Sequence, residues 1–228
     1  VRLIFIANPN NPTGTHVGRD ELKAFLREVS TVRDGSVLVA LDYAYWEYVT
    51  AADLPSPEEL LAEFPQVVVM RTFSKIHGLA GLRLGYGVAT PEVVATLEKI
   101  RQPFNINSLA LVAGPAALSD RAFISKAKTL NARGLAFWRS GLDSLSVPHL
   151  PTQGNFILAD VRRGLGKRGS DVYVGCLKRG AIFRPVANYG LDGWLRISVG
   201  TPEENRFALA ALTAEAGRTP KPRKKKSG

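Results

Sequence analysis

The sequence has one cysteine, Cys176, among 228 residues, so it can form no intrachain disulfide. Acidic residues are also scarce, since 20 Asp and Glu stand against 30 Lys and Arg and the net charge is +10. No apolar run approaches the roughly 20 residues that a membrane-spanning helix needs. No charged and then apolar leader opens the chain. These absences argue against a disulfide-stabilised secreted domain and a membrane protein, and we expect a cytoplasmic protein.

Much of the positive charge lies at the C-terminal end. Residues 219–228 read TPKPRKKKSG, with no apolar periodicity. This composition is typical of a disordered segment, so we expect residues 218–228 to form a basic disordered tail. A solvated terminus is the simpler interpretation, and an arm that contacts nucleic acid is the alternative.

The chain begins in a different way, inside an apparent structural element. Residues 1–7 read VRLIFIA, which is typical of a buried strand, and the first residue is not Met. We therefore expect that an upstream portion of the protein is missing from this sequence.

Short runs rich in β-branched residues alternate with helical patterns in the first part of the chain. Strands are predicted at residues 3–7, 37–41 and 67–71, and helices at 19–29 and 57–63. This alternation predicts an α/β fold with a mainly parallel, mixed sheet and flanking helices.

The pattern changes towards the C-terminus. A strand at residues 84–89 precedes a helix that starts with Thr90 and Pro91, and helices follow at 107–118 and 120–145. Beyond these, strand-like runs at 155–160, 181–184 and 194–199 mix with helices at 171–178 and 202–216, the last opening with a capping box. We predict a large domain over residues 1–146 and a smaller α+β domain over residues 147–217.

Polar motifs follow each of the first three strands. They read NPNNPTG, DYAY and TFSK. Ligands of open α/β sheets bind beyond the carboxyl ends of the strands. An amide, a carboxylate and a lysine at three consecutive strand ends therefore indicate a site, although each motif alone is equally typical of a turn or a solvated loop.

The ordered set NPNNPTG, D-x-x-Y and S-K, with Arg83 eight residues after the lysine in GLAGLRLGYG, resembles the fold-type-I aminotransferases of the aspartate aminotransferase superfamily. The resemblance extends over nearly the whole chain. It implies the large domain typical of transferases that depend on pyridoxal phosphate, that cofactor itself, and a homodimer. It also implies an enzyme that stabilises a carbanion with the cofactor ring as electron sink.

The resemblance assigns roles around the cofactor ring to four residues. Lys75 would hold the cofactor as a Schiff base and then move the proton at the substrate α-carbon. Asp42 would pair with the pyridine nitrogen and keep it protonated. Asn11 and Tyr45 would hydrogen-bond the ring oxygen. The implied catalytic residues are thus Lys75, Asp42 and Tyr45.

The resemblance also implies a site for the cofactor phosphate. Arg83 would bind it with a planar guanidinium, and the hydroxyls of Thr72 and Ser74 would add hydrogen bonds. Members of this family carry a cis bond in the asparagine-proline loop, so Asn11-Pro12 is predicted to be cis.

Further motifs resemble one subfamily. RQPFNIN at residues 101–107 and GNF at 154–156 are similar to segments of histidinol-phosphate aminotransferases. In that comparison Arg184 and Arg196 are the arginines that bind the substrate anion. The implied reaction converts histidinol phosphate and 2-oxoglutarate to imidazole acetol phosphate and glutamate, a step of histidine biosynthesis, and one arginine fork can accept either anion in turn.

Other functions stay open at this point. An aromatic amino-acid aminotransferase or a decarboxylase of the phosphothreonine type could use much the same scaffold. A regulatory protein that binds pyridoxal phosphate without catalysis is a further alternative, although no DNA-binding domain is recognisable. No metal is expected, because His16, His77 and His149 lack the spacing of metal ligands.

Overall fold

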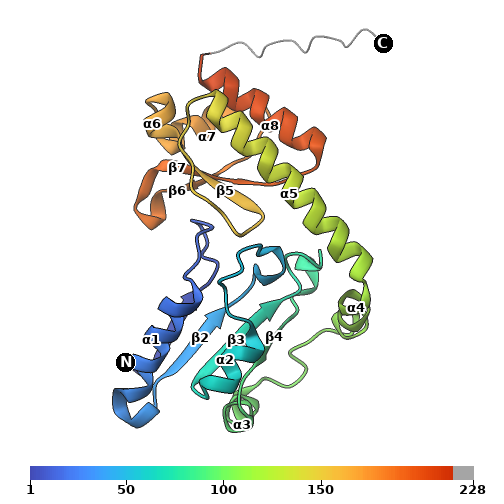
Figure 1. Cartoon of the computed structure of the whole chain (residues 1–228). Helices are drawn as coiled ribbons and strands as arrows, with labels where there is room; N and C mark the ends of the chain where they lie inside the picture. The colour runs from blue at the N-terminus through green and yellow to red at the C-terminus, as the bar shows by residue number, and fades with distance from the viewer. Residues whose placement is uncertain (218–228) are drawn as a thin grey trace. The chain divides into compact units, whose positions relative to one another are not determined.

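The computed structural model describes residues 1–217 of the chain. Contacts divide the chain into two compact units, Val1–Thr129 and Leu130–Gly228. Figure 1 shows the elements of both units. The predicted basic tail at residues 218–228 lies outside the described residues.

The first unit is built on a four-stranded sheet in the order β1-β2-β3-β4. The strands β1 (Leu3–Ala7), β2 (Leu38–Asp42) and β3 (Val67–Thr72) are parallel, and β4 (Gly85–Val88) pairs antiparallel with β3. The prediction of an α/β fold with a mainly parallel, mixed sheet is confirmed. Because the three parallel strands are sequential neighbours, their carboxyl ends lie along one edge.

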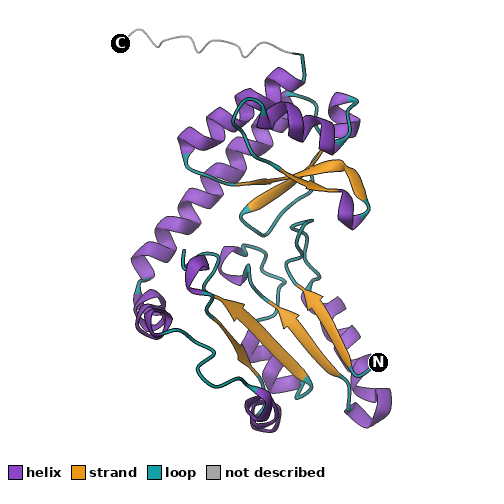
Figure 2. Cartoon of the chain, turned by 180° about the vertical axis from the view of Figure 1, so that it is seen from behind, coloured by secondary structure: helices purple, strands orange, loops and turns teal. Residues whose placement is uncertain are grey.

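Two helices cover one face of this sheet, as Figure 2 shows from the opposite side. Helix α1 (Arg19–Thr31) contributes Leu22 and Leu26 to the core, and α2 (Pro57–Glu63) contributes Leu60. They pack on alternate strand residues such as Val39 and Val69, as the period of two in a strand requires. The α2 helix starts at Ser56, whose side chain accepts a hydrogen bond from the Glu59 N–H.

The first unit also contains short helical segments and two more α-helices. Helix α3 (Pro91–Ile100) starts at Thr90 and Pro91 as predicted, and α4 (Ser108–Ser119) starts where the Asn107 side chain accepts a hydrogen bond from the Ala110 N–H. The single-turn 3-10 helices are η1 (Val32–Gly35), η2 (Trp46–Tyr48) and η3 (Ala80–Leu82).

The long helix α5 (Arg121–Ser144) contains the division between the two units. Its C-terminal half carries Leu135, Trp138 and Leu142, which belong to the core of the second unit. The sequence interpretation puts the boundary at residue 146, where this helix ends, whereas the contacts divide the chain between residues 129 and 130. The two boundaries differ because α5 is one uninterrupted helix, and the apolar side chains of its C-terminal half pack in the second core.

The second unit has a three-stranded antiparallel sheet in the order β5-β7-β6. Its strands are β5 (Phe156–Asp160), β6 (Arg184–Val186) and β7 (Leu191–Ser198). Its further helices are α6 (Val161–Leu165), α7 (Gly169–Leu177), α8 (Pro202–Glu215) and the 3-10 helix η4 (Ala187–Tyr189). Trp138 is fully buried in this core, and the capping box predicted for α8 is present between Thr201 and Glu204.

The strand predicted at residues 181–184 is largely wrong. Residues 181–183 form no strand, and pairing with β7 begins only at Arg184. Ala181 and Phe183 are nevertheless buried in the core while Ile182 is exposed. The alternating burial resembles that of a strand without its ladder of hydrogen bonds, which explains the wrong prediction.

Within residues 1–217, no helix combines the length and the apolar character needed to cross a membrane.

Candidate active site

Backbone hydrogen bonds align the carboxyl ends of the three parallel strands. The Asn8 N–H donates to the Asp42 carbonyl at 3.0 Å, and the Tyr43 N–H donates to the Met70 carbonyl at 2.9 Å. The loops after β1, β2 and β3 therefore leave the sheet at one edge. Asn11 and Lys75 lie in these loops, and the Asp42 carboxylate lies at the end of β2.

Asp42 is the last residue of β2, and its side chain is exposed. Its Oδ1 accepts a hydrogen bond of 2.9 Å from the backbone N–H of Ala44. This bond orients the carboxylate from one side and leaves it able to accept a further hydrogen bond. The residue before it, Leu41, is fully buried and fixes the strand from which the carboxylate projects.

The asparagine loop after β1 is folded by its own polar groups. The Asn10 N–H donates to the Thr15 carbonyl at 2.8 Å, and the Gly14 N–H donates to the Asn10 carbonyl at 2.7 Å. The predicted cis bond at Asn11-Pro12 is confirmed, and Asn8-Pro9 is cis as well. Asn11 lies half-buried in this loop.

Lys75 lies in the tight loop that follows β3. The Leu79 N–H donates to the Phe73 carbonyl and the Gly78 N–H to the Lys75 carbonyl, each at 3.0 Å. The Lys75 Nζ lies 5.1 Å from the centroid of the Tyr45 ring, and Tyr45 is only 5% exposed. An amine and a buried phenol from two neighbouring strand ends are thus brought together.

Arg83 lies next to this loop in a left-handed backbone conformation, with φ of 53°. Its Nη1 donates to the Ala80 carbonyl at 2.8 Å and to the Ser74 Oγ at 3.5 Å. The Thr72 Oγ1 accepts a hydrogen bond of 3.0 Å from the Ser74 N–H. The two hydroxyls and the guanidinium predicted to bind an anion therefore form one connected group, and the guanidinium is exposed.

The two arginines predicted to bind substrate lie in the second unit. Arg184 and Arg196 face each other across β6 and β7, and the Arg196 Cζ lies 5.2 Å from the centroid of the Phe156 ring. Together with Tyr173 and Ser198 they line a cavity of about 410 Å³. Like charges directly opposite each other on a sheet repel. An anion bound between them would remove this repulsion.

A largely buried ion pair between Glu47 and Arg71 is a feature that the sequence did not reveal. Glu47 Oε1 accepts a hydrogen bond of 2.7 Å from Arg71 Nη2, and the two side chains are 12% and 14% exposed. The only signal in the sequence is an arginine at the end of the apolar run VVVMR. Its partner is 24 residues away in the chain, so local pattern could not identify the pair.

Comparison with known proteins shows the family to which this chain belongs. The family model of aminotransferase class I and II matches residues 1–212. The chain belongs to the class I and II aminotransferases. Among curated relatives, it is 47% identical over 211 residues to histidinol-phosphate aminotransferase 2 of Pseudomonas fluorescens (strain Pf0-1), a match that covers 92% of this chain and 55% of the relative.

Two other relatives of this aminotransferase chain are also named histidinol-phosphate aminotransferases. Histidinol-phosphate aminotransferase of Bdellovibrio bacteriovorus is 44% identical over 212 residues, covering 93% of this chain and 55% of the relative. The crystal structure of histidinol-phosphate aminotransferase from Sinorhizobium meliloti in complex with pyridoxal-5'-phosphate superposes with a TM-score of 0.81 at 29% identity, covering 95% of this chain and 57% of that one. The chain thus spans a little over half the length of these relatives.

Proposed function

We propose that this chain is part of a pyridoxal phosphate-dependent aminotransferase that converts histidinol phosphate and 2-oxoglutarate to imidazole acetol phosphate and glutamate. The observation that carries the proposal is the Lys75 amine, 5.1 Å from the Tyr45 ring centroid, at the sheet edge where Asp42 ends the neighbouring strand. The names of the relatives at 44–47% identity support the substrate.

The residues at this edge fit the proposed cofactor chemically. An amine suits an aldehyde, an exposed carboxylate suits a protonated ring nitrogen, and an exposed guanidinium with two hydroxyls suits a phosphate. Lys75, Asp42 and Arg83, with Thr72 and Ser74, supply these groups. When bound, the cofactor would supply an electron sink for the substrate α-carbon.

The chain's own residues would position the reactants and move the proton. Asp42, held by the Ala44 N–H, would keep the ring nitrogen charged, and Asn11 and Tyr45 would donate hydrogen bonds to the ring oxygen. The Lys75 amine would act as the base at the substrate α-carbon. Tyr45 lies over the lysine and would limit the directions from which that amine can approach.

The proposal extends to binding partners and location. Arg184 and Arg196 would bind the phosphate of histidinol phosphate and then a carboxylate of glutamate or 2-oxoglutarate, each as a charge-assisted fork. Their position on facing strands of one cavity supports this role. We further propose a homodimer in the cytoplasm, as the family resemblance implies, with no nucleic acid partner.

Replacing Arg196 with alanine is expected to raise the Michaelis constants of both half-reactions about 10- to 100-fold, because one charge-assisted fork is lost. Cofactor content should change little, since Arg83 is the proposed phosphate ligand. Steady-state kinetics with each substrate varied in turn measure this effect. The matched control is Arg162→Ala, which removes an exposed arginine paired with Asp192 in the same unit. Unchanged constants in the Arg196 variant would refute its role.

The substrate assignment is tested by the first half-reaction. Purified protein loaded with pyridoxal phosphate is mixed with histidinol phosphate, with aromatic amino acids or with phosphothreonine, and loss of each amine is followed. The proposal expects histidinol phosphate to react with the largest kcat/KM and 2-oxoglutarate to regenerate the starting spectrum with release of glutamate. Preference for an aromatic donor, or release of carbon dioxide from phosphothreonine, would favour the alternatives instead.

A further inference from the structure

The buried pair of Glu47 and Arg71 joins the two turns that carry Tyr45 and Lys75. Glu47 lies in η2, the turn closed by the hydrogen bond of 2.9 Å from the Tyr48 N–H to the Tyr45 carbonyl. Arg71 precedes the lysine loop on β3, and His77 follows the lysine. The His77 Nε2 lies 3.6 Å from the same Glu47 Oε1 that accepts from Arg71.

The pair lies on the opposite side of the sheet from the proposed cofactor ligand Asp42. Asp42 stands in register with Met70, and successive strand residues point to opposite faces, so Arg71 points to the other face. There its guanidinium carbon lies 5.8 Å from the centroid of the Trp46 ring, and Trp46 stacks on the buried Tyr43. Arg71 and Glu47 therefore have no direct route to a ligand bound beside Asp42 and act through the residues they hold.

Burying this ion pair carries a desolvation cost. Three buried atoms of the cluster, Glu47 Oε2, Arg71 Nε and His77 Nδ1, have no hydrogen-bond partner within the described residues. Buried ion pairs are often no more stabilising than apolar side chains of the same size. Stability alone thus gives little reason for a carboxylate and a guanidinium at this place.

We propose that Glu47 and Arg71 are positioning residues for Lys75, which fix its turn against the Tyr45 turn and cancel each other's charge between these two turns. The inference rests on the proposed function, in which Lys75 reacts as a neutral amine. The other charged or titratable groups on the surrounding segments are Asp42, Tyr43, Tyr45, Tyr48, Glu58, His77, Arg83 and Tyr86. Hydrogen bonds to its carboxylate, and after them the Arg71 charge, lower the pKa of Glu58.

A neighbouring phenol shows that the Glu47 charge acts beyond its own pair. Burial, and after it the negative charge of Glu47, raise the pKa of Tyr48 to about 12. Removing either member of the pair would leave one uncompensated charge between the two turns. A positive charge near an ammonium group favours loss of its proton, and a negative charge has the opposite effect.

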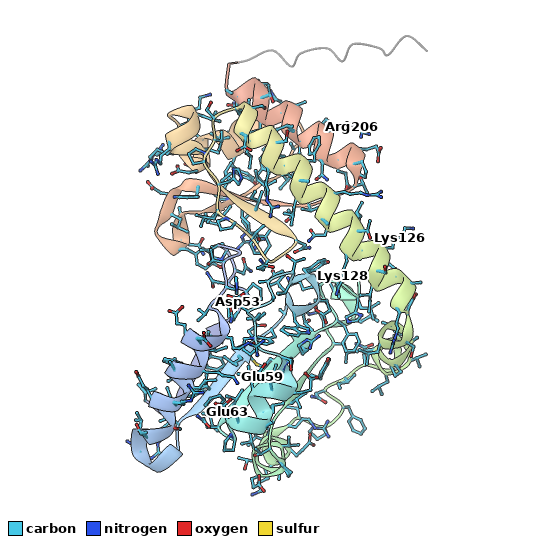
Figure 3. The ribbon with its side chains drawn as sticks, viewed as in Figure 1. Asp53, Glu59, Glu63, Lys126, Lys128 and Arg206 are labelled. Carbon is cyan, nitrogen blue, oxygen red and sulfur yellow. The ribbon has the colours of Figure 1, made fainter. Side chains whose placement is uncertain are left out.

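The test measures how fast the Lys75 amine of the full chain, without cofactor, is acetylated by limiting acetic anhydride at neutral pH. Mass spectrometry quantifies each lysine, and Lys126 and Lys128 on α5, both labelled in Figure 3, serve as internal references. Only the unprotonated amine reacts. Glu47→Gln leaves Arg71 uncompensated and should speed Lys75 acetylation at least about threefold, whereas Arg71→Met leaves Glu47 uncompensated and should slow it by a similar factor.

Matched controls remove an exposed pair from the same unit. Glu63 binds Lys23 and Arg27 at the surface, so Glu63→Gln and Arg27→Met should leave Lys75 acetylation within about twofold of the unaltered chain. The double variant Glu47→Gln with Arg71→Met restores neutrality and should also stay within about twofold, even where a single variant folds poorly. Thermal unfolding of every variant separates charge effects from loss of structure.

The outcomes distinguish this inference from the proposed function. Acceleration in both single variants would mean that the pair only holds the fold together, and equal rates in all variants would mean that its charges do not reach Lys75. Either result overturns the inference. Opposite shifts support it even if the unaltered chain fails to attach pyridoxal phosphate. Attachment of the cofactor with unchanged acetylation would leave the proposed function standing alone.

Discussion

Replacing Lys75 with alanine is expected to abolish covalent attachment of pyridoxal phosphate. It is also expected to lower turnover about 10²- to 10⁴-fold, the usual contribution of a positioned general base. The amine that lies 5.1 Å from the centroid of the Tyr45 ring would be lost while the surrounding loop keeps its backbone hydrogen bonds. Turnover of histidinol phosphate and the visible absorbance of the lysine-bound cofactor measure the two effects.

The control for this variant is another lysine of the same unit. Lys126 is exposed on α5, so Lys126→Ala should retain both cofactor attachment and turnover. Lys75→Arg separates charge from chemistry, because it keeps a cation but lacks a nucleophilic amine. An alanine variant that still attaches the cofactor, or that keeps more than about a tenth of the turnover, would remove Lys75 from the mechanism.

The second large effect concerns stability, because Trp138 anchors the core of the second unit. Its side chain is fully buried, its indole lies 6.0 Å from the Phe183 ring, and its Nε1–H donates to the Asn205 Oδ1 at 2.9 Å. Trp138→Ala is expected to reduce the free energy of unfolding by about 3–5 kcal/mol through the cavity it leaves and the hydrogen bond it removes. Urea unfolding followed by circular dichroism measures the change.

Two further variants divide this cost into its parts. Trp138→Phe keeps an aromatic ring but leaves the buried Asn205 without its indole donor, so a loss of about 1–3 kcal/mol is expected. Arg139→Ala changes the next residue of the same helix, which is exposed, and should cost no more than about 0.5 kcal/mol. A cost below about 1 kcal/mol for Trp138→Ala would contradict the packing described for this core.

The strand ends could be predicted from the sequence because their signals are local. The runs before Asp42 and Lys75 are short, β-branched and bounded by polar residues, and both became parallel strands. The cis bond at Asn11-Pro12 followed from the family resemblance rather than from any local propensity. The roles of individual residues at this edge stay predictions.

Features that depend on distant contacts could not be predicted in this way. The pair of Glu47 and Arg71 joins residues 24 apart, and its members look like ordinary polar positions in the sequence. The division of the chain lies inside α5. It could not be predicted, because an uninterrupted helical pattern carries no sign of where its apolar face begins to pack in another core. At residues 181–183, burial alternates as in a strand although no ladder forms, because burial pattern and backbone pairing are separate properties.

The central claim is that Lys75 is the residue to which pyridoxal phosphate attaches. The most direct measurement is reduction of the mixture of chain and cofactor with borohydride, followed by peptide mapping with mass spectrometry. The account predicts one modified peptide, with the added mass on Lys75, and its loss when histidinol phosphate is supplied before reduction. Modification spread over several exposed lysines, or confined to a lysine other than Lys75, would contradict it.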